Sequence, residues 1–358
     1  MKKNKFTISW GDFSRYRSSM FGLSIIGIMV FHYFEHIRSA HVLLESEQFW
    51  DYYIGSTGVD FFLFLSGMGL FYSLTKNDDI RQFYKKRLVR ILPAYLLVSV
   101  PFFAWRDFIH LHTGILTFIR DLLFLNFIDH ADTTYWFIFF IIMMYLLFPP
   151  LFKFLDTASQ GKRFLRLLAV LAIYVLFSWG LFTLNPVVFD NVDIALARVP
   201  IFVLGCYFAP RIKKNDRFTV WQIILFVLAT ALLMYCKYNI HFGIWLPLPY
   251  WIRLTNSLWA FPLMIISLYL CKLIKLTKFL QGFVKISGAL SLELYLGHVS
   301  ARIFLTAHHM SLYILWQYLI MIVLSYLGSF ILKWLENKIQ GQLLPLSRKN
   351  RKVSKEID

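Results

Sequence analysis

The chain has 358 residues, of which 58% are hydrophobic, 19% aromatic and only 16% charged. An ordinary soluble domain carries about 25% charged residues, so this composition excludes a soluble protein and indicates one embedded in a membrane. The net charge of +17 is spread between apolar runs instead of forming one basic patch, which argues against a nucleic-acid partner.

Apolar runs that cross a hydrocarbon core of about 30 Å need about 20 residues each. The sequence predicts an all-α, polytopic membrane helix bundle of about ten spans, at 19–37, 57–75, 88–105, 135–155, 164–184, 193–209, 218–236, 256–274, 286–306 and 312–334. A further apolar stretch at 115–128 is short and carries Arg120 and Asp121 in its middle. We expect an interfacial or re-entrant helix there.

The basic residues are consistent with this topology. With the N-terminus in the cytoplasm, the inner segments hold 30 of the 37 lysines and arginines, as the positive-inside rule requires. We therefore expect both termini to be cytoplasmic. One membrane domain is predicted at 1–336, followed by a basic cytoplasmic tail at 337–358.

Residues 32–36 read HYFEH, which has the spacing of one class of zinc protease. A zinc protease also needs a further ligand, a substrate cleft and a soluble scaffold, and the sequence shows none of these, so we predict no metal. His32, Glu35 and His36 instead lie along one side of the first predicted span. His32 is the deepest of the three, and neutral imidazole is the cheapest general base to keep in a membrane.

Other polar residues at membrane depth also require a partner or a water-filled cavity. Those inside predicted spans are Asp60, Arg198, Glu293 and His298. We expect them to line a polar cavity. In the second span, Gly67 and Gly69 favour the close approach of another helix.

Arg87 and Arg90 lie three residues apart at the cytoplasmic mouth of the third predicted span. Their charge agrees with the positive-inside rule alone. The alternative is an anion site, because guanidinium groups bind phosphate through paired hydrogen bonds.

Six stretches, taken in order, resemble the membrane acyltransferase family 3, whose members are integral membrane O-acyltransferases of cell-envelope glycans. The stretches are FGLSIIGIMVFH, GVDFFLFLSGMGL, YKKRLVRILPAYL, YWFIFFIIMMYLLFPPL, RVPIFVLG and ISGALSLELYLGH. The resemblance implies ten spans, a histidine in the first span that acts in acyl transfer, and a basic pair associated with an acyl-CoA donor. By position, His32 takes the first role and Arg87 and Arg90 take the second.

The chain departs from the family at one position. Many members have an arginine eleven residues before the histidine, where this chain has Phe21. The nearest preceding arginine is Arg17, one turn or about 6 Å further down the helix, and it is the candidate to join Arg87 and Arg90 at the donor in place of the missing one. The resemblance also implies that Asp60, Ser66, Trp136, Arg198 and His298 line the cavity.

The function implied is transfer of an acyl group, most often acetyl, from acyl-CoA to a hydroxyl of a cell-envelope polysaccharide or exopolysaccharide. We expect a bacterial cytoplasmic membrane, with the bilayer, acyl-CoA and a glycan as partners. His32 acts either as general base or as acyl carrier, and Asp60 or Glu35 orients its ring. The alternative is a transporter or polymerase of polysaccharide intermediates, which has no need for acyl-CoA.

Overall fold

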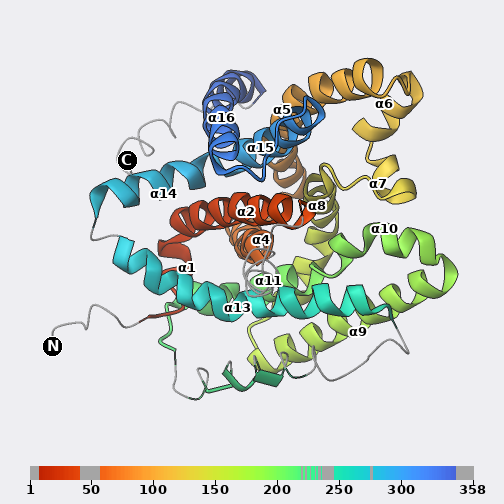
Figure 1. Cartoon of the computed structure of the whole chain (residues 1–358). Helices are drawn as coiled ribbons and strands as arrows, with labels where there is room; N and C mark the ends of the chain where they lie inside the picture. Colours follow the sequence, from red (N-terminus) through yellow and green to blue (C-terminus); the bar gives the residue numbers. More distant parts are fainter. Residues whose placement is uncertain are drawn as a thin grey trace.

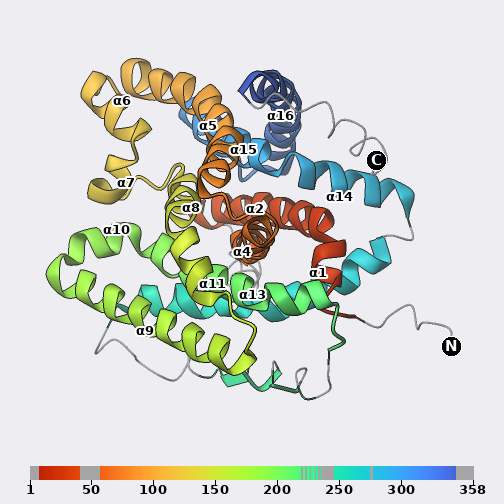
Figure 2. The same ribbon diagram turned by 180° about the vertical axis from the view of Figure 1, so that it is seen from behind.

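The computed structural model describes residues 8–40, 57–218, 246–274 and 277–343, together with parts of 221–235. It is 86% helical. Outside the helices, the described residues pair as strands only in an isolated bridge between Ser9 and Arg217. Figures 1 and 2 show a helical bundle with α2 and α4 at its centre.

Eight helical segments of the described residues are long and apolar enough to cross a membrane. They are α2 (Arg17–Ser39), α4 (Gly58–Lys76), α5 (Ile80–Ala104) with the π-helical turn Trp105–His110, α8 (Trp136–Leu155), α9 (Gln160–Leu184), α10 (Pro186–Leu196) with α11 (Val199–Lys214), α13 (Leu248–Ile274) and α16 (Leu315–Leu343). The chain is therefore a polytopic helical membrane protein, as predicted. The orientation of its termini stays a prediction.

Two of the ten predicted spans are not among these eight. The span at 286–306 is divided at Leu290 between α14 (Lys278–Ala289) and α15 (Ser291–Ala307), and the span at 218–236 lies partly outside the described residues. The stretch 115–128 forms two short helices, α6 (Ile115–Leu122) and α7 (Leu125–His130). It therefore does not cross a membrane as one helix.

Close backbone contacts explain how α2 and α4 are held in the centre. A Cβ added to Gly67 would lie 2.3 Å from the carbonyl oxygen of Phe202, and one added to Gly205 would lie 2.1 Å from that of Phe64, so α4 packs directly on the backbone of α11. In the same way, a Cβ on Gly22 of α2 would lie 1.9 Å from a carbonyl oxygen of α14. Only glycine fits at contacts this short.

The segment before α2 belongs to the core. Trp10 and Phe13 are fully buried, and the Trp10 ring stacks on Phe208 at 4.6 Å between centroids. In the short helix α1 (Asp12–Arg15), Asp12 is 3.1 Å from the Nζ atom of Lys272 on α13. These contacts fix the end of α2 that carries Arg17.

Candidate active site

His32 lies on α2 in a cluster with two charged side chains. Its Nδ1 atom contacts Oε2 of Glu35, one turn further along the helix. Arg302 on α15 contacts the same ring nitrogen and donates a hydrogen bond to Oε2 of Glu35 at 2.9 Å. An ionised carboxylate only accepts hydrogen bonds, so when Nδ1 carries the ring proton it donates to Glu35. In this tautomer Nε2 of His32 is unprotonated and can accept a proton or attack a carbonyl.

The cluster forms part of the lining of a cavity of about 280 Å³, which we call the histidine cavity. Among the other residues that line it are Trp136, Arg198 and Arg253. The guanidinium group of Arg198 lies over the Trp136 ring, 4.9 Å from its centroid. A cation and an aromatic ring are thus stacked in the lining of the cavity that also contains the His32 cluster.

Asp60 is buried next to this cavity and does not contact His32. Its Oδ1 atom lies 3.6 Å from Nε of Arg198, the residue directly before α11 at the break between α10 and α11. Of the two carboxylates proposed to orient the imidazole, Glu35 contacts the ring and Asp60 pairs with Arg198.

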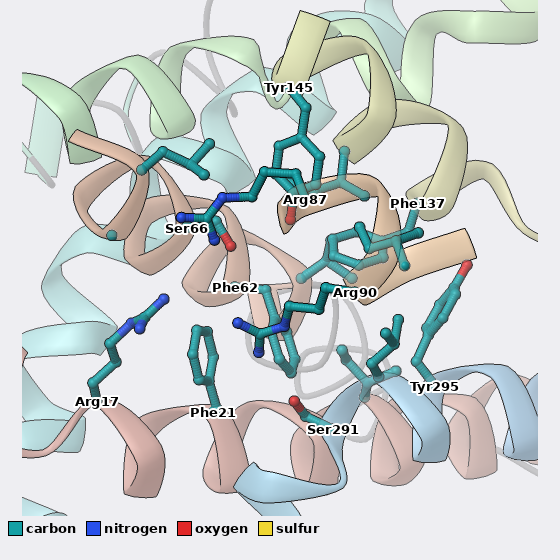
Figure 3. A pocket seen from close by; sticks show the side chains of 17 residues that line it. Arg17, Phe21, Phe62, Ser66, Arg87, Arg90, Phe137, Tyr145, Ser291 and Tyr295 are labelled. Atoms are coloured by element: carbon teal, nitrogen blue, oxygen red, sulfur yellow. The ribbon is translucent and has the colours of Figure 1, made fainter. Parts of the chain in front are cut away.

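A second cavity lies toward the other end of α2, and we call it the arginine cavity (Figure 3). Arg17 of α2 and Arg87 and Arg90 of α5 line it, and their guanidinium groups point into the same space. Its lining contains no acidic residue among the described parts of the chain. The Nε atoms of Arg17 and Arg87 are buried and have no hydrogen-bond partner in the described structure. Three guanidinium groups and no carboxylate in the described lining give this cavity the positive charge that binding of an anion requires.

Arg17 packs on Phe21 in the arginine cavity. Its guanidinium carbon lies 5.0 Å from the centroid of the Phe21 ring, and both residues line the arginine cavity. Gly69 on α4 provides the space, because a Cβ added there would be 2.6 Å from Nη2 of Arg17. This contact gives Gly69 a role beyond helix packing.

The remaining predicted site residues lie in different places. Ser66 lines the arginine cavity instead of the histidine cavity. His298 is fully buried behind His32, with ring centroids 5.4 Å apart, and its Nδ1 atom lies 2.6 Å from the carbonyl oxygen of Leu294. Glu293 lines neither of these cavities, because its carboxylate pairs with Lys333 of α16 at 2.7 Å.

The sequence interpretation missed Arg302, Arg253 and Tyr295. Arg302 follows His298 by four residues inside the predicted ninth span, so the rule that charged residues at membrane depth mark functional sites points to it as well. Arg253 is held by Asp193 of α10. Tyr295 lines both cavities, as do Ile28 and Val59, so the two cavities are neighbours.

Comparison with known proteins gives one match. A family model described as an acyltransferase domain matches residues 22–334. No curated protein and no solved structure shows a significant match to the chain. The matched region runs from α2 to α16 and includes every lining residue of the two cavities except Arg17 and Phe21.

Proposed function

The chain belongs to acyltransferase family 3, and from this premise we propose that it transfers a short acyl group, most often acetyl, from acyl-CoA to a sugar hydroxyl of a cell-envelope polysaccharide or exopolysaccharide. Family membership supports an acyl-transferring enzyme over a transporter or polymerase of polysaccharide intermediates. With several membrane-spanning helices, the enzyme is a multi-pass membrane protein, and we assign it to the bacterial cytoplasmic membrane.

The observation that carries the proposed donor is the arginine cavity. CoA has several phosphate groups, and Arg17, Arg87 and Arg90 present guanidinium groups with no acidic residue in the described lining. Charge-assisted hydrogen bonds from arginine to phosphate are among the strongest that proteins make. The positive-inside rule puts this end of α2 on the cytoplasmic side, where acyl-CoA is available.

The histidine cavity suits an uncharged, hydroxyl-rich acceptor. Each of the three arginines that line it is within ion-pair distance of a carboxylate, namely Arg302, Arg198 and Arg253. In contrast to the arginine cavity, this space therefore has little unbalanced charge. The Trp136 ring, covered on one face by Arg198, adds an apolar part to this lining, and the paired side chains offer donors and acceptors that fix the orientation of a bound molecule.

In the proposed reaction, a bond forms between the acceptor oxygen and the thioester carbonyl carbon, and the bond from that carbon to the CoA sulfur breaks. With Nδ1–H donated to Glu35, Nε2 of His32 either takes the proton of the hydroxyl as general base, or attacks the thioester first and carries the acyl group until the hydroxyl displaces it. In both cases His32 passes the hydroxyl proton to the CoA thiolate. No metal takes part.

The test uses membranes from cells that produce the full chain or His32→Ala at equal abundance. After incubation with radiolabelled acetyl-CoA, label is counted in the polysaccharide fraction. Loss of a general acid–base group costs about 10²- to 10⁴-fold in rate, so His32→Ala should reduce labelling by at least this lower bound. His309→Ala, an exposed histidine outside both cavities, should label like the wild type. Undiminished labelling in His32→Ala would reject the assignment, and an unlabelled wild type would reject the donor.

A further inference from the structure

One polar group lies where the two cavities meet. The side chains that line both are Ile28 of α2, Val59 of α4 and Tyr295 of α15, and of these only Tyr295 carries a polar atom. Figure 3 shows Tyr295 at the end of the arginine cavity that lies away from Arg17. A thioester that extends from the arginines toward His32 would cross the part of the lining that Tyr295 shares with Ile28 and Val59.

The Tyr295 hydroxyl has no hydrogen-bond partner in the described structure. The side chain is only 7% exposed, and the contact of the hydroxyl with the backbone of Phe137 does not meet hydrogen-bond geometry. Other tyrosines of the core are paired: Tyr95 donates to a carbonyl oxygen at 3.0 Å, and Tyr135 bonds to the Ser300 hydroxyl at 2.5 Å. Buried hydroxyl groups are almost always satisfied. The Ser99 and Ser257 hydroxyls are also unpaired in the described part of the chain, but only Tyr295 combines an unpaired hydroxyl with a place in the lining of both cavities.

The ring that carries this hydroxyl is held in place. It packs edge to face on Phe137 of α8, with centroids 5.2 Å apart, and lies 6.0 Å from the ring of His298, which in turn lies 5.4 Å from His32. Ile28 precedes His32 by one turn of α2, about 6 Å. The Tyr295 ring is therefore fixed by packing, with the His298 ring in contact with both it and the ring of His32.

We propose that the Tyr295 hydroxyl donates a hydrogen bond to the thioester carbonyl oxygen and stabilises the negative charge that this oxygen gains when the carbonyl carbon is attacked. This inference rests on the proposed function, because it takes acyl-CoA as the donor. The tyrosine keeps its proton throughout. The charge returns to the carbonyl when the carbon–sulfur bond breaks and the CoA thiolate leaves. Preorganised donors of this kind are effective because they need no reorientation during the reaction.

The decisive variant is Tyr295→Phe, which removes only the oxygen. Loss of one such donor lowers kcat about 10²- to 10³-fold, so we expect that fall in acetyl transfer to polysaccharide, with the KM for acetyl-CoA unchanged. Removal of an unpaired buried hydroxyl does not weaken packing, so membrane abundance and thermal midpoint in detergent should equal those of the wild type. A wild-type kcat in Tyr295→Phe would overturn the inference.

Two controls separate catalysis from structure. Tyr135→Phe breaks the bond to Ser300 outside both cavities, so it should lower the thermal midpoint and leave kcat within about twofold. The second control is the dithioester analogue of acetyl-CoA, whose carbonyl sulfur is a weak acceptor. With it, Tyr295→Phe and the wild type should transfer at similar rates, and an undiminished difference would overturn the inference. A wild type that transfers no acyl group from either donor rejects the proposed function instead.

Discussion

Arg302 on α15 donates a hydrogen bond of 2.9 Å to the Glu35 carboxylate on α2 and contacts the imidazole of His32 with the same nitrogen. The two helices are thereby joined at the proposed reacting group, and the carboxylate that accepts from the imidazole is itself held. We expect Arg302 to act as a positioning residue for His32.

Arg302→Met should lower kcat for acetyl transfer by about 10- to 150-fold, because a hydrogen bond to a charged group contributes about 1.5–3 kcal/mol. Arg302→Lys keeps the charge and should recover part of this loss. The measurement is the rate of label transfer from acetyl-CoA against donor concentration. A positioning role changes kcat and leaves the donor KM unaltered, so an equal loss in both substitutions together with a raised KM would contradict it.

For a residue of the arginine cavity we expect the opposite pattern, a raised KM for acetyl-CoA and a nearly unchanged kcat. Arg17→Gln removes one of the three guanidinium groups that line this cavity, so the KM for acetyl-CoA should rise about 10- to 150-fold, with kcat within a few-fold of the wild type. The matched control is Arg81→Gln, an exposed arginine of α5 that lines neither cavity. If the two variants have the same KM, Arg17 does not bind the donor.

Two glycines two residues apart on α4 should respond differently to the same substitution. Gly67→Ala puts a methyl group 2.3 Å from the backbone oxygen of Phe202, which cannot move alone. It should cost about 1–3 kcal/mol of stability. Gly69→Ala meets only the flexible end of Arg17 at 2.6 Å, so the fold should tolerate it while the guanidinium shifts. We expect a lowered thermal midpoint in detergent for the first and a raised acetyl-CoA KM for the second. A raised KM for Gly67→Ala together with a lowered thermal midpoint for Gly69→Ala would contradict both interpretations of the contacts.

Part of the fold and part of the candidate site can be predicted from the sequence alone. Length and apolar runs are local properties, so they predicted the helical membrane bundle, and the cost of polar groups at membrane depth pointed to His32, Asp60 and Arg198. Apart from Glu35, which follows His32 by one turn, the partners of these groups are not local. Arg302 and Glu35 are 267 residues apart in the chain, and no spacing rule connects them.

Local patterns were also insufficient where backbone contacts decide the structure. The apolar run at 286–306 gives no sign of the break at Leu290, which lies next to a contact that only glycine allows: a Cβ on Gly288 would be 2.0 Å from the carbonyl oxygen of Ser18. The sequence predicted Glu293 in the cavity lining because it gave no sign of the residue that pairs with it, Lys333, which belongs to another helix. Both differences arise from helix packing, which the sequence encodes only through residues far apart.

The ion cluster between α15 and α16 gives the last prediction. Lys333 lies 2.7 Å from Oε1 of Glu293 and 3.0 Å from Oε2 of Glu336, so one lysine serves two carboxylates that are at most 1% exposed. Lys333→Met would leave both without a counter-charge. Breaking a buried pair costs about 3–5 kcal/mol, and we expect a loss near the lower figure because the lysine side chain is 35% exposed.

Glu336→Gln should instead be close to neutral, since it relieves the repulsion between the carboxylates and leaves Glu293 paired with Lys333. The thermal midpoint of the purified protein in detergent measures both changes. The cluster lies outside the linings of both cavities, so a folded Lys333→Met variant should keep the wild-type KM for acetyl-CoA. A wild-type midpoint in Lys333→Met would show that the two carboxyl groups need no cation, as when they share a proton. A raised KM would show that the cluster acts on the donor site through α15.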